Sequence, residues 1–75
     1  MSTKIELEFF SVDEKLPEKS YDVLIVSSGH LYEVYYSKVH NLFNAYDYQE
    51  REEAVSNAIR DVTAWAYMPD WRIVT

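Results

Sequence analysis

Residues 21–36 read YDVLIVSSGHLYEVYY, and this stretch decides the fold. Its first seven residues form a continuous run rich in β-branched side chains, which is typical of a central strand. The dipeptide Ser28-Gly29 follows and contains the only glycine of the chain, so it predicts a tight turn. Residues 31–36 then alternate between two faces, as a returning strand does. The stretch therefore predicts an antiparallel hairpin.

The sequence before the hairpin predicts one more strand and a loop. Residues 4–10 read KIELEFF, in which apolar and charged side chains alternate, so we expect a half-buried strand. Residues 11–20 are mostly polar and form a predicted loop. Pro17 favours an extended conformation at Leu16, and we expect Leu16 to act as an apolar plug under this loop.

The sequence after the hairpin begins with an ambiguous segment. Residues 40–46 could form a third meander strand, in which Asn41 and Asn44 mark turns. From Asp47 the apolar period becomes helical, and Asp47 and Glu50 have the spacing of a capping box. With Arg60 placed in the last turn, the spacing predicts a helix at about residues 48–60.

Residues 62–68 read VTAWAYM, in which large side chains alternate with small or unbranched ones, and Pro69 ends the run. This pattern predicts a last strand. Trp71 and Ile73 could fold back over it as a clasp. The element order predicts an α+β domain, with four to five antiparallel strands and one helix packed on one face of the sheet. Residues 1–75 form a single predicted domain without a linker.

Composition excludes several classes of protein. The 13 acidic and seven basic residues give a net charge of −6, which disfavours binding to nucleic acid or to an anionic membrane. The longest apolar run is Val23–Val26, too short to span a bilayer, and the first residues lack the apolar core of a signal peptide. We therefore expect a cytoplasmic protein. Because Cys is absent, the chain has no disulfide and no thiolate metal site.

Catalytic chemistry has few candidates in this sequence. A single glycine excludes a phosphate-binding loop. His30 and His40 are the only imidazoles, and two ordinary surface histidines are the simplest interpretation. A metal site would need both of them with a carboxylate such as Glu33 or Asp47, and ten residues is not a recognised ligand spacing. We predict a protein that is not an enzyme and that has no cofactor and no metal.

Tyrosine is the most informative residue type, since seven occur in 75 residues. Its amphipathic ring is favoured at protein interfaces. Six tyrosines exceed what one small core needs and form a predicted surface for a partner protein or for a homodimer: Tyr32, Tyr35, Tyr36, Tyr46, Tyr48 and Tyr67. Stacking on single-stranded bases would need a basic groove, and only Lys38 lies near, so nucleic acid is an unlikely partner.

Acidic residues suggest an alternative function, namely an inhibitor that imitates nucleic acid and occupies a basic cleft of a host or defence protein. This hypothesis requires one contiguous stripe of carboxylates, not a set dispersed among Lys15, Lys19 and Arg51. Two groups would have to form the stripe: Asp13, Glu14, Glu18 and Asp22 in the first half of the chain, and Glu50, Glu52 and Glu53 in the second.

Three segments together resemble a known family. Phe10–Pro17 reads FSVDEKLP and precedes Val23–Val26, which resembles an opening of the form W-x-x-V-x-E-x-L-P followed by V-L-V. Val62–Pro69 reads VTAWAYMP and resembles a closing V-T-H-W-x-P-L-P. The pairing is similar to domain of unknown function 551, a family of small proteins frequent in phages and prophages.

The resemblance implies a setting and a packing contact, but no activity. It suggests an accessory protein of a phage, prophage or other mobile element, and it places Trp65 against the loop near Leu16 and Pro17. Three departures matter: Phe9 or Phe10 replaces the opening Trp, Ala64 replaces the His, and Tyr67 replaces the first closing Pro. Any role of that His does not carry over. We predict a small protein-interaction module.

Overall fold

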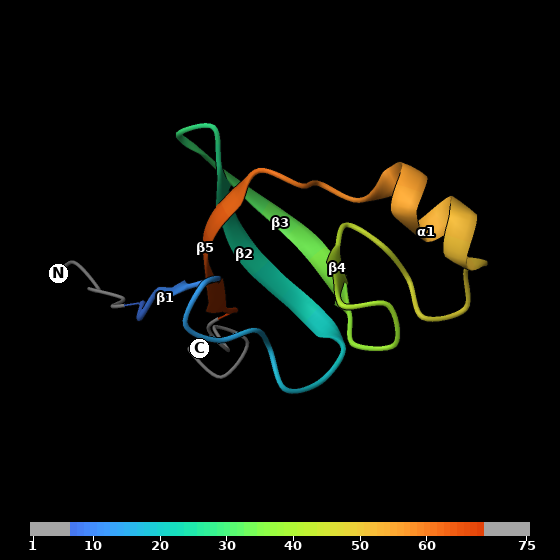
Figure 1. Cartoon of the computed structure of the whole chain (residues 1–75). Helices are drawn as coiled ribbons and strands as arrows, with labels where there is room; N and C mark the ends of the chain where they lie inside the picture. Colours follow the sequence, from blue (N-terminus) through green and yellow to red (C-terminus); the bar gives the residue numbers. More distant parts are fainter. Residues whose placement is uncertain (1–6, 69–75) are drawn as a thin grey trace, which may run out of the picture.

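The computed structural model describes residues 7–68, which form one curled antiparallel sheet and one short helix. The strand order is β1-β5-β2-β3-β4 (Figure 1). This arrangement confirms the predicted α+β class. The elements are β1 (Phe10–Ser11), β2 (Tyr21–Ser27), β3 (His30–Ser37), β4 (Leu42–Phe43), α1 (Arg51–Asn57) and β5 (Val62–Tyr67).

The predicted hairpin is confirmed and forms the centre of the sheet. β2 pairs with β3 along its whole length, from Tyr21 opposite Tyr36 to Ser27 opposite His30. Ser28 and Gly29 connect the strands with φ angles of 51° and 78°. Positive φ at both central residues is the geometry whose twist matches that of the two strands, and glycine adopts it without steric cost.

The last strand is also confirmed, and it lies on the other side of β2. β5 pairs antiparallel to β2, with Ile25 opposite Trp65. The register shifts between Val26, opposite Ala64, and Ser27, opposite Val62, so Thr63 is the extra residue of a β-bulge. The Thr63 hydroxyl lies 3.3 Å from the Val26 carbonyl oxygen, to which it donates a hydrogen bond.

The first strand is much shorter than residues 4–10. β1 contains only Phe10 and Ser11, which pair with β5, while residues 7–9 are outside the sheet and residues 4–6 lie outside the described part of the chain. Phe10 lies opposite Trp65, and β5 ends at Tyr67, so β5 offers partners for two further residues at most. Within residues 7–68, the alternation therefore predicted a longer strand than β5 can pair with. The predicted clasp of Trp71 and Ile73 also lies outside the described residues.

The predicted helix was wrong at both ends, since α1 spans only Arg51–Asn57. Glu50 is the N-cap and makes no side-chain capping bond. The capping box fails because the Asp47 carboxylate accepts hydrogen bonds from Ser20 and Ser37 instead. The backbone is already extended at Ala58, which ends the helix.

The residues after Ala58 belong to the sheet rather than to the helix. The Ile59 N–H donates to the Phe43 carbonyl at 3.0 Å, in an isolated antiparallel bridge, and Val62 begins β5. Arg60 therefore lies outside the helix, whose last turn holds no basic residue. Long-range strand pairing has overridden the helical spacing. Figure 1 shows α1 beyond the β4 edge of the sheet, not across one of its faces.

The ambiguous segment does contain a meander strand. β4 is two residues long and pairs with the end of β3, with Tyr36 opposite Phe43. Asn41 and Asn44 flank it with φ angles of 58° and 65°. Both asparagines thus mark turns, as predicted, because Asn tolerates this left-handed conformation better than most residues.

The sheet has an inner and an outer face. Alternate residues of the three long strands are buried on the inner face, with Trp65 at its centre. The Trp65 indole N–H donates to the Lys15 carbonyl at 2.9 Å, so the predicted contact with the loop is confirmed. Within that loop Pro17 is fully buried and Leu16 is 37% exposed. The proline, not the leucine, is therefore the plug.

Candidate functional site

Three of the predicted tyrosines stack into one surface group, which we call the tyrosine ladder: Tyr35, Tyr46 and Tyr48. The Tyr35 and Tyr46 rings lie 5.1 Å apart with an interplanar angle of 18°, and the Tyr46 and Tyr48 rings lie 5.4 Å apart at 22°. Tyr46 is 45% exposed and Tyr48 is 82% exposed. The ladder therefore extends from the sheet into solvent.

The backbone places the first two rings of the ladder. Tyr35 lies on the outer face, because it alternates with the buried Val34 and Tyr36. Its carbonyl accepts hydrogen bonds from the N–H groups of Asn44 at 2.9 Å and Ala45 at 3.2 Å. The chain leaves β4 along the end of β3 and so delivers Tyr46 onto Tyr35.

Asp47 anchors the same loop between the two outer rings. Its carboxylate accepts hydrogen bonds from Ser37 at 2.7 Å and from Ser20 at 2.8 Å. The bond from Ser37, followed by the bond from Ser20, lowers the pKa of Asp47 below its ordinary value of 3.8. Ser37 is fully buried, and Ser20 also accepts the Lys38 N–H at 2.7 Å. One carboxylate thus ties the ladder to β3 and to the loop before β2.

Gln49 closes the loop on its helical side. Its side-chain oxygen accepts the Tyr46 N–H at 2.7 Å, and its amide nitrogen donates to Glu53 of α1 at 2.8 Å. The Arg51 guanidinium donates to the His40 carbonyl at 2.9 Å, which fixes the start of α1 beside β4. The ladder is consequently held by bonds at both ends of its loop.

The other three candidate tyrosines do not join the ladder. Tyr36 is fully buried on the inner face, where its hydroxyl donates to Asn41 at 3.1 Å and burial raises its pKa. Its assignment to an interaction surface was therefore wrong, because core packing removes it from solvent. Tyr67 is half-buried against Trp65 at 4.8 Å and Tyr21 at 5.4 Å. Tyr32 is exposed on β3, close to the turn.

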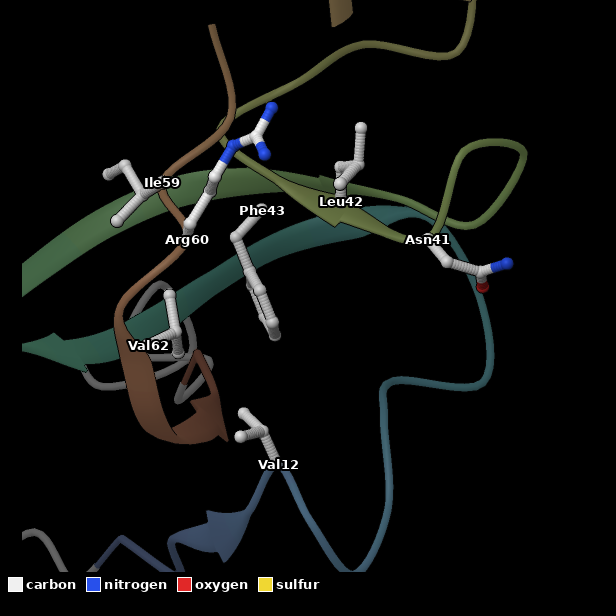
Figure 2. Close-up of a pocket in the computed structure, with 7 residues that line it drawn as sticks. All are labelled: Val12, Asn41, Leu42, Phe43, Ile59, Arg60 and Val62. Carbon is white, nitrogen blue, oxygen red and sulfur yellow. The ribbon is translucent and has the colours of Figure 1, made fainter. Parts of the chain in front are cut away.

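A second feature is an apolar pocket on the open side of the curled sheet. Its volume is about 240 Å³. Figure 2 shows that it lies between the loop after β1 and the chain around β4. The Val12, Phe43 and Val62 side chains point toward this space, whereas the Arg60 guanidinium points away (Figure 2). No acidic residue and no histidine lines it, so its lining could hold an apolar group but has no residue suited to general acid–base catalysis. The lining residues are Val12, Asn41, Leu42, Phe43, Ile59, Arg60 and Val62.

The histidines lie at opposite ends of β3. His30 begins the strand beside the turn, and the His40 ring contacts the Gln49 carbonyl at 3.1 Å just beyond the other end. A strand rises about 3.3 Å per residue, which separates them by more than 20 Å. His40 lies close enough to Asp47 for its charge to help lower the pKa of that carboxyl, but His30 is far from both. Residues 7–68 contain no group of three or more metal-ligating side chains.

The acidic residues occupy several parts of the fold. Asp13 and Glu14 lie in the turn after β1, Glu18 lies in the following loop, and Asp22 lies on the outer face of β2. The second group lies at the start of α1, and Figure 1 shows that helix well apart from the loop after β1. The Lys15 ammonium lies within the first group, 4.5 Å above the Phe10 ring. The carboxylates therefore do not form one stripe.

A carboxylate that was not a candidate site residue has a structural role. Asp61 accepts a hydrogen bond from Ser27 at 2.7 Å and another from Ser28. These two bonds, first that from Ser27, lower the pKa of Asp61. Asp61 thus joins the β2–β3 turn to the start of β5. The sequence did not indicate this role, because the serines that bind Asp61 lie more than 30 residues away.

Comparison with known families gives a match over most of the chain. The model of a family described as "Protein of unknown function (DUF551)" matches residues 9–70. The chain belongs to the DUF551 family. The resemblance drawn from the two end motifs is therefore confirmed, and the match also spans the tyrosine ladder and the pocket. The comparisons of this DUF551 chain with curated proteins and with solved structures gave no match.

The structure explains why the two end motifs of the DUF551 chain occur together. Phe10 of the opening motif packs on Trp65 of the closing motif, with ring centroids 4.9 Å apart. The Trp65 indole reaches the opening loop at Lys15. The motifs are thus two sides of one packing contact. In the described part of this DUF551 chain, no helix has the length and the apolar character that crossing a membrane requires.

Proposed function

We propose that this DUF551 protein is a small, non-enzymatic module that binds a partner protein through its tyrosine ladder. The observation that carries the proposal is the exposure of Tyr48, 82% of whose surface is open to solvent although its ring is stacked on Tyr46. Large aromatic rings are enriched at the centres of protein interfaces. An exposed ring held in a defined orientation is the arrangement that such a contact uses.

The ladder loses little conformational freedom on binding. Binding has to offset the entropy of ordering side chains and loops at the interface. Here the loop is already fixed by the bonds of Asp47 to Ser37 and Ser20, and by the bond from the Tyr46 N–H to Gln49. Preorganised aromatic surface therefore supports tight contact even in a small module.

The arrangement of side chains also supports a role without catalysis. A nucleophile needs a base and an orienting group within hydrogen-bond reach. The serines that make side-chain hydrogen bonds to carboxylates bind Asp47 and Asp61, and both carboxylates hold loops together. The cytoplasmic setting and the role as an accessory protein of a phage, prophage or other mobile element are parts of the same proposal. They rest on composition and on the family resemblance.

Affinity purification with matched variants tests the proposal. Tagged wild type, Tyr48→Ala and Phe9→Ala would be used to capture partners from a lysate of the organism that encodes the chain. Phe9 is the control because it is an exposed aromatic residue outside the ladder. We expect a stoichiometric partner that wild type and Phe9→Ala retain and Tyr48→Ala loses. A partner retained equally by Tyr48→Ala, or repeated absence of any stoichiometric partner, would contradict the proposal.

A further inference from the structure

The outer edge of β3 is only partly covered. β4 pairs with Tyr36 and Ser37 alone, and the chain after β4 adds its bonds at Tyr35. In the strand order, β3 has β2 on one side and β4 on the other. Within residues 7–68, no strand pairs with His30–Val34 on the side facing away from β2. Five residues of a long strand thus present an open edge.

The free hydrogen-bonding groups of this edge belong to Leu31 and Glu33. In an antiparallel sheet, the N–H and C=O groups of a strand point alternately to its two neighbours. The Tyr35 carbonyl points away from β2, since it accepts the N–H groups of Asn44 and Ala45. Leu31 and Glu33 share the orientation of Tyr35. Each therefore directs one N–H donor and one C=O acceptor outward.

Apart from the charge of Glu33, the edge lacks the features that usually prevent strand addition. Natural edge strands are protected by lysine, by proline, by a bulge or by being short. Residues 30–34 read HLYEV, without lysine or proline, and the register with β2 is regular along them. Leu31 is 58% exposed and Tyr32 is 45% exposed. This edge is open to pairing and carries apolar side chains on both faces.

Charge indicates what kind of segment would pair. The five described strands contain no lysine and no arginine, and their only carboxylates are Asp22 and Glu33. Both lie on the outer face, Asp22 opposite Tyr35 and Glu33 opposite Leu24. The whole chain has a net charge of −6. A basic segment is therefore complementary to this edge.

We propose that the outer edge of β3 binds an extended, basic segment of a partner protein, which joins the sheet as an added strand. This inference rests on the proposed function and names the partner's chemistry. The backbone of the segment bonds to Leu31 and Glu33, and a lysine or arginine opposite Glu33 pairs with its carboxylate. That basic side chain lies next to Tyr35, two residues farther along the same face, and so reaches the first ring of the tyrosine ladder.

Defined peptides test the edge directly. The probe is an acetylated and amidated heptapeptide, Thr-Val-Lys-Val-Lys-Val-Thr, and its control has Glu in place of both Lys. Titration of isotope-labelled wild type would be followed by the amide NMR signals. We expect the basic peptide to bind at least tenfold more tightly than the acidic one, with the largest shifts at Leu31 and Glu33. Equal affinity, or shifts confined to other elements, would overturn the proposal.

Two variants separate backbone pairing from charge. Proline at position 33 removes an outward N–H and leaves the hairpin bonds to β2 in place, so Glu33→Pro should retain the fold and lose peptide binding. Glu33→Gln retains the backbone donor, and its preference for the basic peptide should fall several-fold. Circular dichroism checks both folds, and the Glu33→Gln result decides the matter if Glu33→Pro does not fold. Unchanged charge preference in Glu33→Gln would overturn the proposal.

Self-association provides a further decisive outcome. A dimer seen by light scattering in wild type and absent in Glu33→Pro would make a second copy the occupant of the edge, which contradicts the proposal. The ladder is tested separately by Tyr48→Ala in the purification experiment. Failure of peptide binding together with a partner that depends on Tyr48 would reject the edge alone. Failure of both experiments would reject the interaction module itself.

Discussion

The two faces of the sheet use aromatic residues in similar pairs but in different surroundings. On the inner face, Trp65 lies 4.9 Å from Phe10 and is fully buried. On the outer face, Tyr46 lies 5.4 Å from Tyr48, and both rings are exposed. The ring spacing is nearly equal, so spacing alone does not separate a structural aromatic from one available to a partner. What separates them is whether another segment of the chain covers the ring.

Such a covering segment is present over Trp65 and absent over Tyr48 among the described residues. The loop between β1 and β2 lies over Trp65, accepts its indole N–H at Lys15 and buries Pro17. No described residue provides a comparable cover for Tyr48, which is the most exposed of the large hydrophobic side chains. The comparison predicts that mutations on the inner face change stability, whereas mutations in the ladder change binding.

The largest expected effect is that of Trp65→Ala. Replacing a fully buried tryptophan by alanine removes its packing and leaves a cavity, which costs about 3–5 kcal/mol of the free energy of unfolding. In a domain of this size a single core rarely supplies more than about 3–5 kcal/mol, so this variant should be largely unfolded or close to it. Urea denaturation followed by circular dichroism measures the loss. A decrease below about 1 kcal/mol would show that Trp65 is not central to the core.

The next largest effect is expected at the turn between β2 and β3. Gly29→Ala places a Cβ at φ 78°, which costs about 1–2 kcal/mol although no other atom lies within 4 Å of that position. Gly29→Asn is the matched control, because Asn tolerates the left-handed region and should lose less. Thermal denaturation of both variants measures the difference. Equal stability of the alanine variant and wild type would indicate that the turn adopts another geometry.

The sequence alone predicted the central part of the sheet. The hairpin, the last strand and the contact of Trp65 with the opening loop depend on patterns that are local or shared with a family. The helix predicted over residues 48–60 was wrong in its bounds. The spacing of Ile59 and Val62 fits a helix, but both residues pair with strands distant in the sequence. Periodicity cannot show whether such a partner strand is present.

The candidate site was only partly predictable for the same reason. The surplus of tyrosine indicated a surface, but the sequence could not separate Tyr36, which is in the core, from Tyr35, which is not. That difference follows from the strand register. The role of Asp47 was missed because its hydroxyl partners lie ten and 27 residues away. The pocket could not be predicted for the same reason, because Val12 and Phe43 are distant in the sequence and line one space only in the folded sheet.

A smaller effect is expected for Asp47→Ala, which removes the anchor beneath the ladder. Hydrogen bonds from Ser37 and Ser20 lower the pKa of Asp47, so its ionised form stabilises the fold. This contribution is present above the ordinary pKa of 3.8 and disappears as the pH falls through the lowered value in the folded state. Wild type should therefore be more stable than the variant at pH 7, and the two should converge in strong acid.

Urea denaturation at several pH values measures that convergence. Asp13→Ala is the control, since the Asp13 side chain lies on an exposed turn away from the ladder, and its stability should follow that of wild type throughout. A difference between wild type and Asp47→Ala that is constant from neutral to strongly acidic pH would contradict ionisation as the source of the stabilisation.

The smallest effect on stability, and the sharpest contrast with Trp65, is expected for Tyr48→Ala. Its ring is 82% exposed, so its removal should change the free energy of unfolding by no more than about 0.5 kcal/mol. If the ring is the centre of an interface, the same change should weaken partner binding by about 2 kcal/mol, or roughly 30-fold. Denaturation and calorimetric titration with the captured partner measure the two quantities on one variant. A large loss of stability, or binding that is unchanged, would place Tyr48 with the structural aromatics and remove the distinction between the faces.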